Sequence, residues 1–407
     1  MFDKLSSIKT IITRVKELTK SQYDFLFYIL GMFLSIKTRI NFLQCARHSN
    51  EYSEKSCRSQ FEQYVDFVAI NSEYIRQKGS GRYVIAYDLS YLKKSGKPTA
   101  GTGKYWSGCA QKALWGLEVG LVSVIDIGNH TAFHVDAIQT PDSQERKSKD
   151  IDLPDHYAQS ILYSKDTLEK FSKYLTVDAY FGKKDFIDRI LKQSKLDVIT
   201  RLRCDANCKY LYNGPARQGR GAPKKYDGKV DWIQPDLKYF KLTYQDESVK
   251  VYDSILYCVF LKPKIRVAFC QYLNQQFDVN SYKIYVCTDL KLPALLIQQY
   301  YKSRFQQEFL IRDAKQFTGL QDCQARSVNK LEYHWNMALT AVNVAKFEHW
   351  LDKTDIEKAS FSMADVKTLY QNQLLIERFF QIFPNVEEMT KNNPKIKELY
   401  TFGSIAA

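Results

Sequence analysis

The spacing of apolar residues changes near residue 80 of the chain. Before this point apolar residues recur every three or four positions, in segments such as SIKTIITRVKELT and YDFLFYILGMFLSI. This spacing predicts helices over residues 1–78. The sequence RQKGSG comes next and predicts a linker, because glycine favours irregular backbone. From Arg82 the apolar residues form short runs such as RYVIAYDL, which predict strands.

The strand-rich part of the chain predicts a mixed sheet that another segment interrupts. LWGLEVGLVSVIDIG and HTAFHVDAIQT are two strands joined by a Gly-Asn turn, which indicates a hairpin, and helices alternate with strands up to residue 203. Residues 204–281 are β-rich and irregular, and the alternation resumes over residues 282–325. The pattern predicts an α/β fold: a mixed sheet over residues 79–203 and 282–325, a β-rich insertion between them, and helical regions at both ends, the second over residues 326–407.

One motif in the N-terminal helical region suits DNA binding. A short helix, a polar turn and a longer helix, CRSQFEQYVDFVAI, with Lys55 and Arg58 near its start, match the layout of a helix-turn-helix. Ordinary helical packing explains the same pattern equally well. We therefore predict a helical DNA-binding region over residues 1–78 without deciding which helices contact DNA.

A polar stripe marks the segment YYKSRFQQEFLIRDAK. On a helix that advances by roughly 100° per residue, Tyr301, Arg304, Glu308 and Lys315 fall within about 60° of one another. The strand-like KIYVCTD precedes this helix and ends at Asp289, a residue type that caps helices well. The stripe is therefore predicted to be a polar face on an otherwise buried helix.

Two acids follow apolar strands, Asp88 in VIAYDLS and Asp178 in LTVDAYFG. Together with Glu308 they could hold two Mg²⁺ ions, which prefer oxygen ligands and leave room for phosphate oxygens and water. Such a pair of ions cuts phosphodiesters by in-line attack. Each acid also has a structural explanation, since strand-to-loop acids are common and Glu308 has Arg304 one helical turn away.

Other acids and histidines compete for such a metal site. The main competitors among the acids are Asp126, Asp136, Asp185 and Asp289. Of these, only Asp289 has another predicted role, as the helix cap. His130 and His134 share one face of a predicted strand but lack a third ligand nearby, so we predict that they serve the fold or lie on the surface.

Charge and cysteine content narrow the partners and the compartment. The net charge of +14 favours a polyanion, with nucleic acid first and an acidic membrane surface second. The most apolar run, FLFYILGMFL, is too short to span a bilayer, and no cleavable signal is visible. The nine cysteines are scattered, which is typical of reduced thiols. We expect a bacterial cytoplasmic, nucleoid-associated protein without a membrane partner.

These residues together resemble a known family. Tyr301, Arg304, Glu308 and Lys315 match the Y-x2-R-x3-E-x6-K signature of cut-and-paste DDE transposases from bacterial insertion sequences. Asp88 and Asp178 resemble the first two acids of that family, and a β-rich insertion before the glutamate helix is another of its traits. The resemblance covers roughly residues 80–325 and implies a ribonuclease H-like catalytic domain.

The resemblance also implies an activity and its partners. Asp88, Asp178 and Glu308 would bind two Mg²⁺ ions, with Mn²⁺ as a substitute, to cut element ends and join the 3′-hydroxyls to a target. The partners would be double-stranded DNA, as terminal inverted repeats and target, and a second copy of the chain, because two ends must meet. Residues 326–407 would form the dimer interface or complete the core.

Further DNA contacts are expected on the stripe and in the insertion. In the family the positions of Tyr301, Arg304 and Lys315 face the DNA backbone, and an aromatic residue of the insertion stacks on a flipped base. Trp232 suits that stack by type and region, although a tryptophan of the core is the alternative. The basic segment GPARQGRGAPKKYDGK contacts DNA or forms a solvated loop, and its candidate residues are Arg217, Arg220, Lys224 and Lys225.

Two other functions remain open. A ribonuclease H-like nuclease or resolvase would cut DNA without joining it, and the residues do not separate this function from a transposase except through the four-residue signature. A DNA-binding regulator with an inactive catalytic core is the third candidate. The presence of all three acids argues against it.

Overall fold

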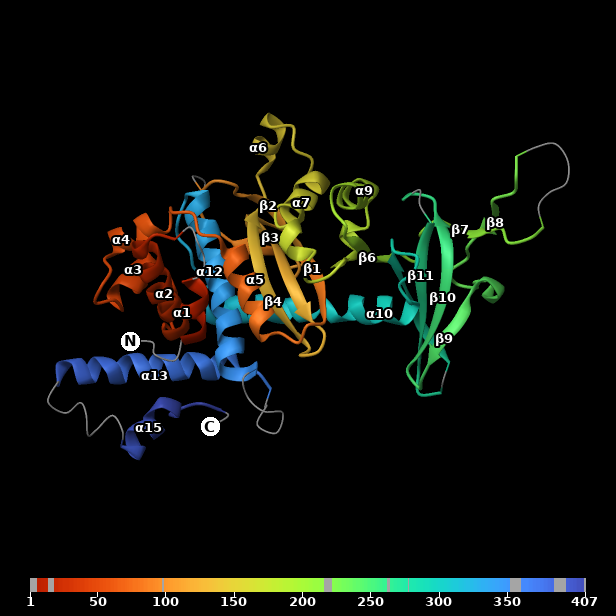
Figure 1. Cartoon of the computed structure of the whole chain (residues 1–407). Helices are drawn as coiled ribbons and strands as arrows, with labels where there is room; N and C mark the ends of the chain where they lie inside the picture. The colour runs from red at the N-terminus through yellow and green to blue at the C-terminus, as the bar shows by residue number, and fades with distance from the viewer. Residues whose placement is uncertain are drawn as a thin grey trace.

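The computed structural model describes residues 6–13, 18–96, 99–215, 222–261, 264–276, 278–351, 360–383 and 393–405. A long mixed sheet forms the middle of the molecule, with the helices of both chain ends at one side and the insertion at the other (Figure 1). This architecture confirms the predicted α/β class. None of the described helices is both long enough and apolar enough to cross a lipid bilayer.

Five helices precede the sheet: α1 (Ser6–Ile12), α2 (Lys20–Ser35), α3 (Phe42–Arg47), α4 (Glu54–Gln60) and α5 (Phe67–Lys78). The single long helix predicted over CRSQFEQYVDFVAI is wrong, because α4 ends at Gln60 and α5 begins only at Phe67. Asp66 causes the new start, since its side chain accepts a hydrogen bond from the N–H of Ala69 at 2.8 Å. The predicted helix-turn-helix therefore lacks its long second helix.

The first part of the sheet alternates with helices, as predicted. Its elements are β1 (Tyr83–Lys93), β2 (Gly103–Ser107), β3 (Lys112–Asp126), β4 (Thr131–Gln139), α6 (Ser143–Ser148), α7 (Leu153–Leu162), α8 (Lys165–Leu168), β5 (Tyr174–Val177), the 3₁₀ turn η2 (Ala179–Phe181), α9 (Lys184–Gln193) and β6 (Asp197–Leu202). β3 and β4 form the expected antiparallel hairpin. β1 pairs antiparallel with β3 and parallel with β5, and β5 pairs parallel with β6.

The insertion extends the same sheet. Its elements are β7 (Cys208–Leu211), β8 (Tyr226–Lys229), the 3₁₀ turn η3 (Leu237–Tyr239), β9 (Lys241–Gln245), β10 (Val249–Cys258), β11 (Lys264–Leu273) and β12 (Val279–Cys287). β12 pairs antiparallel with β6, so the sheet runs without a break in the order β2-β3-β1-β5-β6-β12-β11-β10-β7-β8. Figure 1 shows β7 and β8 at the far end of this sheet from β1.

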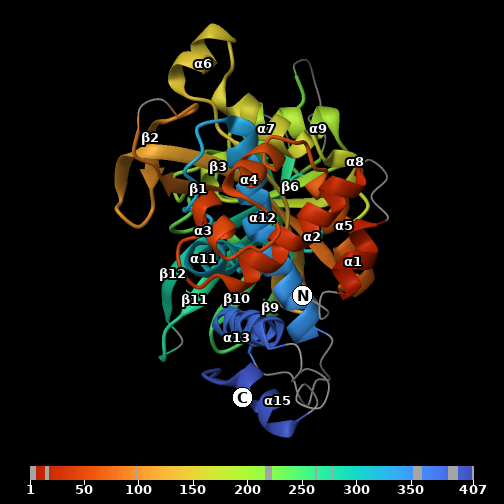
Figure 2. The same ribbon diagram turned by 90° about the vertical axis from the view of Figure 1, so that its left-hand side faces the viewer.

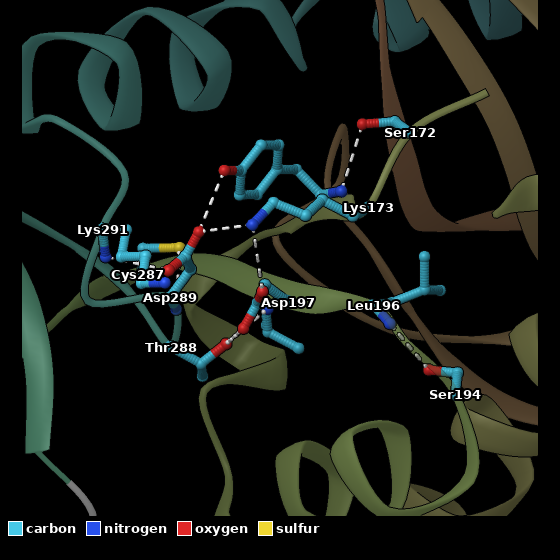
Figure 3. Close-up of polar contacts among 11 residues, drawn as sticks. Ser172, Lys173, Ser194, Leu196, Asp197, Cys287, Thr288, Asp289 and Lys291 are labelled. Atoms are coloured by element: carbon cyan, nitrogen blue, oxygen red, sulfur yellow. Dashed lines mark hydrogen bonds and ion pairs between the residues drawn. The ribbon is translucent and has the colours of Figure 1, made fainter. Parts of the chain in front are cut away.

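A polar network fixes the point where β12 rejoins the first part of the sheet (Figure 3). Asp289 accepts hydrogen bonds from Lys173 at 2.6 Å and from Tyr174 at 3.0 Å. Thr288, the residue before Asp289, donates a hydrogen bond from its hydroxyl to Asp197 at the start of β6, at 2.7 Å. The predicted capping role of Asp289 is wrong, because the next helix has Pro293 at its N-cap.

The remaining elements are helical: α10 (Ala294–Ser303), α11 (Gln306–Phe317), α12 (Val328–Lys346), the π-helical turn η4 (Phe347–Leu351), α13 (Met363–Ile382) and α15 (Pro394–Thr401). α10 and α11 run from the insertion back towards β1, and α12 lies between the sheet and the N-terminal helices (Figure 1). Most of the α12 residues are buried. α12 therefore completes the core, which is one of the two roles predicted for residues 326–407.

Side chains of α12 occupy the free edge of β4. Asn336 accepts from the N–H of Ala137 at 3.0 Å and donates to its carbonyl at 3.1 Å. Asn343 makes the same pair of bonds with His134, both at 2.9 Å. An edge strand exposes unpaired backbone groups, and here two carboxamides take the place of a neighbouring strand. Burial of these amides requires that both partners stay paired.

Replacing Asn343 with alanine should destabilise the protein. The change leaves the buried N–H and carbonyl of His134 without partners, and we expect the free energy of unfolding to fall by about 2–4 kcal/mol. Urea unfolding of the full chain measures this loss. The exposed Asn329 on the same helix provides the control, since N329A should change stability by less than about 0.5 kcal/mol. Equal effects of the two changes would contradict the role of Asn343 at the strand edge.

Candidate active site

Three carboxylates from distant parts of the chain line one cavity of about 1010 Å³. Asp88 lies within β1, opposite Leu121 of β3. Asp178 directly follows β5 and accepts a hydrogen bond from the N–H of Tyr180 at 2.6 Å. Glu308 lies in the first turn of α11. The structure thus brings together the three acids that the sequence singles out.

The position of Asp88 differs from its expected place. The strand was predicted to end at this residue, but β1 continues to Lys93, because β3 extends the antiparallel ladder as far as Gly116. Asp178 does end its strand, as predicted. The residues before and after Asp88 in β1 are therefore paired with β3. This pairing fixes the position of the Asp88 side chain more firmly than a loop would.

The predicted helix of the polar stripe is broken between α10 and α11. Its bonds tighten to a three-residue spacing here, with the N–H of Arg304 bonded to Tyr301 at 3.3 Å and that of Gln307 bonded to Arg304 at 2.9 Å. Gln307 is fully buried and donates to the carbonyl of Leu121 at 2.8 Å. This bond seats the start of α11 on β3, and the adjacent Glu308 is placed beside the cavity as a result.

Arg304 connects two of the acids. Its Nη1 donates to Oδ2 of Asp88 at 2.7 Å and its Nη2 to Oε1 of Glu308 at 3.0 Å. The Arg304 side chain is only 13% exposed. The Arg304–Glu308 pair considered from the sequence is present, and Asp88 is a further partner that spacing along the chain does not reveal.

Electrostatics within the cavity oppose the ionisation of Asp88. The pKa of Asp88 is raised to about 6, chiefly by burial. The Arg304 guanidinium lowers this pKa, while the charges of Asp178 and Glu308 raise it. Burial also lowers the pKa of Lys315, whose Nζ donates to the carbonyl of Tyr91 at 3.0 Å. The acids therefore repel one another in a partly buried site, as expected of carboxylates arranged to hold a cation.

The sequence analysis missed several groups on the cavity wall. Glu118 of β3 is 7% exposed and accepts a hydrogen bond from Tyr157 at 2.9 Å. Lys104 and Trp106 lie on the hairpin of β2 and β3, which projects from one side of the molecule (Figure 2). Trp106 is 63% exposed. The alternation of GKYWS could have identified these two residues, because it places Lys104 and Trp106 on one face of the strand.

The described residues of the insertion that were predicted to contact DNA do not line this cavity. Trp232 is 4% exposed, and its indole N–H donates to the carbonyl of Ala206 at 2.7 Å. It packs in the core of the insertion, which is the alternative that the sequence left open beside base stacking. The exposed Lys224 pairs with Asp227 at 2.6 Å. Lys225 is also exposed, while the predicted contacts Arg217 and Arg220 lie outside the described residues.

Tyr301 lies beside Arg304, whose guanidinium carbon is 5.9 Å from the centre of the Tyr301 ring, while the competing acids lie outside the cavity. The Tyr301 ring packs on Tyr285, with ring centroids 4.8 Å apart. The side chain of Asp126 is bound in a turn, where it accepts from the N–H of Ser80 at 2.8 Å. The other competing acids do not line the cavity either, and they are Asp136, Asp185 and Asp289. His134 is buried and bonded to Asn336, as expected of a histidine that serves the fold.

The comparisons with known proteins point to one class of protein. Residues 158–344 match the sequence model of a family described as "Transposase DDE domain". No curated protein matches the chain. The matched region contains Asp178 and Glu308 and begins after Asp88, which therefore joins the site by geometry alone.

Residues 158–344 are thus similar to a transposase DDE domain, and a domain of this class implies an enzyme that binds, cuts and joins DNA. The mixed sheet is consistent with the ribonuclease H-like fold of such domains. DDE transposases generally use divalent metal ions. Within the described ranges, no three His, Cys, Asp or Glu side chains are arranged closely enough to hold a metal ion.

Replacing Asp88 with asparagine should stabilise the protein at neutral pH. The pKa of Asp88 is raised from 3.8 to about 6 on folding, so wild-type stability falls as pH rises through this interval. We expect D88N to unfold with a free energy about 2–3 kcal/mol higher than wild type at pH 7. The gain should shrink as pH falls through about 6 and vanish near pH 4, where Asp88 is protonated in both states.

Urea unfolding across this pH range measures the difference. The exposed Asp185 at the start of α9 provides the matched control, and D185N should follow wild type at every pH. A loss of stability in D88N at pH 7 would show that the Arg304 ion pair outweighs the burial of the Asp88 charge.

Proposed function

We propose that the chain is an insertion-sequence transposase that cuts element ends and joins the resulting 3′-hydroxyls to target DNA. The observation that supports this proposal is the common cavity lined by Asp88, Asp178 and Glu308. These residues come from β1, the end of β5 and α11, more than 200 positions apart at the extremes. Their meeting in one partly buried cavity requires the whole fold.

The donor set suits a pair of Mg²⁺ ions, with Mn²⁺ as a substitute. Carboxylate oxygens are the ligands that both ions accept, and the mutual repulsion of the three acids favours a bound cation. When bound, the ions supply an activated water or 3′-hydroxyl and stabilise the leaving oxygen of the phosphodiester. The acids are not yet in ligand geometry here, since Arg304 lies between two of them.

The chain itself binds and orients the DNA strand. Lys93, Lys104, Arg146 and Lys315 line the same cavity, and cations at these places hold backbone phosphates near the acids. Gln307 keeps α11 on the sheet, so Glu308 stays beside the strand that is cut. We further propose that residues 1–78 and the basic loop of the insertion contact DNA outside the cavity, and that two copies act together on two element ends.

Loss of any one acid should abolish cleavage. In D88A, D178A and E308A, we expect cutting of DNA that carries the element ends to fall by at least about 100-fold, because the developing charge is no longer stabilised. DNA affinity should survive in gel-shift assays. D185A, which removes an exposed acid outside the cavity, should cut like wild type. Normal cutting by any of the three variants would contradict the assignment of that residue.

The ability to join DNA ends to a target distinguishes a transposase from a nuclease that only cuts DNA. Element ends supplied with free 3′-hydroxyls should insert into a supercoiled plasmid in the presence of Mg²⁺, because the 3′-oxygen is the attacking group. Ends that finish in a 3′-deoxynucleotide should bind without inserting. Cutting without insertion of the hydroxyl-bearing ends would instead identify a ribonuclease H-like nuclease.

A further inference from the structure

The guanidinium of Arg304 occupies the space between two proposed metal ligands. Nη1 is bonded to Asp88 at 2.7 Å and Nη2 to Glu308 at 3.0 Å, so one flat cation bridges an acid of the sheet and an acid of the helix. The Arg304 side chain is 13% exposed, against 44% for Glu308. Arg304 is thus enclosed among the acids rather than presented to solvent.

The oxygen atoms that Arg304 uses are the ones a shared cation would need. Oδ1 of Asp88 accepts a hydrogen bond from the N–H of Leu89 at 2.9 Å. Oδ2 is therefore the oxygen of Asp88 that is more available to a metal ion, and this atom accepts the hydrogen bond from Arg304. On Glu308 the bonded atom is Oε1. A divalent ion that joined the two acids would meet the positive charge of Arg304 within a few ångströms and would share its acceptors, which disfavours simultaneous occupancy.

The pairing of Arg304 is also incomplete. Its Nε is buried and has no hydrogen-bond partner within the described part of the chain. A buried donor without a partner weakens the arrangement that contains it. Arg304 is therefore held by two carboxylates and can exchange them for another anion, and a phosphate group offers the fork-shaped guanidinium an equally good partner.

We propose that Arg304 competes with divalent metal ions for Asp88 and Glu308, so that the DNA-free chain binds the metal weakly and loads it when Arg304 turns to a DNA phosphate. This inference rests on the proposed function, because it takes the two acids to be metal ligands. It assigns Arg304 two alternating partners. Without DNA, Arg304 controls access of the metal ion to the two acids. With DNA, it binds a backbone phosphate.

The test measures Mn²⁺ binding to the full chain without DNA, from the electron paramagnetic resonance signal of free Mn²⁺. In R304Q the side chain stays polar but is shorter and loses its charge, and we expect the variant to bind Mn²⁺ at least about tenfold more tightly than wild type. R304K retains a charge without the fork and should lie between the two. Thermal melting confirms that each variant is folded.

Two further variants separate the possible outcomes. R312Q removes an equal charge from α11, the helix that carries Glu308, at an exposed arginine paired with Asp313 at 3.0 Å, and it should bind Mn²⁺ like wild type. D88N should lose binding. Suppose that D88N loses Mn²⁺ binding while R304Q binds Mn²⁺ no more tightly than wild type. This result would refute competition by Arg304 and would still support the proposed metal site.

If D88N binds Mn²⁺ as well as wild type does, the proposed site itself is wrong. A folded R304Q that fails to bind Mn²⁺ at all also refutes the competition, because removal of Arg304 is expected to open the site. Tighter binding in R312Q equal to that in R304Q would assign the effect to net charge rather than to the position of Arg304.

Discussion

The pairing of β12 with β6 is the constraint on which the candidate site depends. The strands of the insertion extend the sheet beyond β6, and β12 brings the chain back to the side of β6, so a large β-rich segment enters the chain without separating the two parts of the cavity. The network of Lys173, Asp197 and Asp289 fixes this return (Figure 3). From there α10 packs along β12, β6 and β5, α11 reaches β1 and β3, and Glu308 comes to line the same cavity as Asp88.

The cost of gathering three acids explains the rest of the local design. Carboxylates that repel one another in a partly buried cavity destabilise the fold, as the raised pKa of Asp88 indicates. Arg304 offsets part of this repulsion, and Gln307 holds the helix in place with uncharged hydrogen bonds. The site therefore combines repulsion among carboxylates with a scaffold that uncharged hydrogen bonds hold in place.

Periodicity predicted the features that depend on one element alone. Glu308 and Lys315 both lie in α11 and line the same cavity, as expected of residues about two helical turns apart, and the change of spacing near residue 80 marked the start of the sheet. Features that depend on a second element were missed. The break between α10 and α11 reflects the seating of Gln307 on β3, and β1 passes Asp88 because β3 continues beside it.

The same distinction applies to Trp232 in the insertion and to the predicted cap at Asp289. Trp232 was a candidate for base stacking by type and region, but burial depends on Phe269 and other partners far along the chain. Asp289 had the right chemistry for a cap, yet Lys173 competes for its carboxylate from more than a hundred positions away. In both cases a residue type has two suitable roles, and only contacts remote in sequence decide between them.

The edge of β4 sets a limit on how the C-terminal region acts. Because Asn336 and Asn343 replace a neighbouring strand along β4, α12 cannot leave the sheet without exposing unpaired backbone groups in the core. The boundary expected at residue 326 is thus a change of secondary structure rather than a division between independent units. Beyond α12, the described helices α13 and α15 carry exposed apolar side chains such as Leu375, Phe379 and Leu399, so this part of the region contributes less to the core than α12 does.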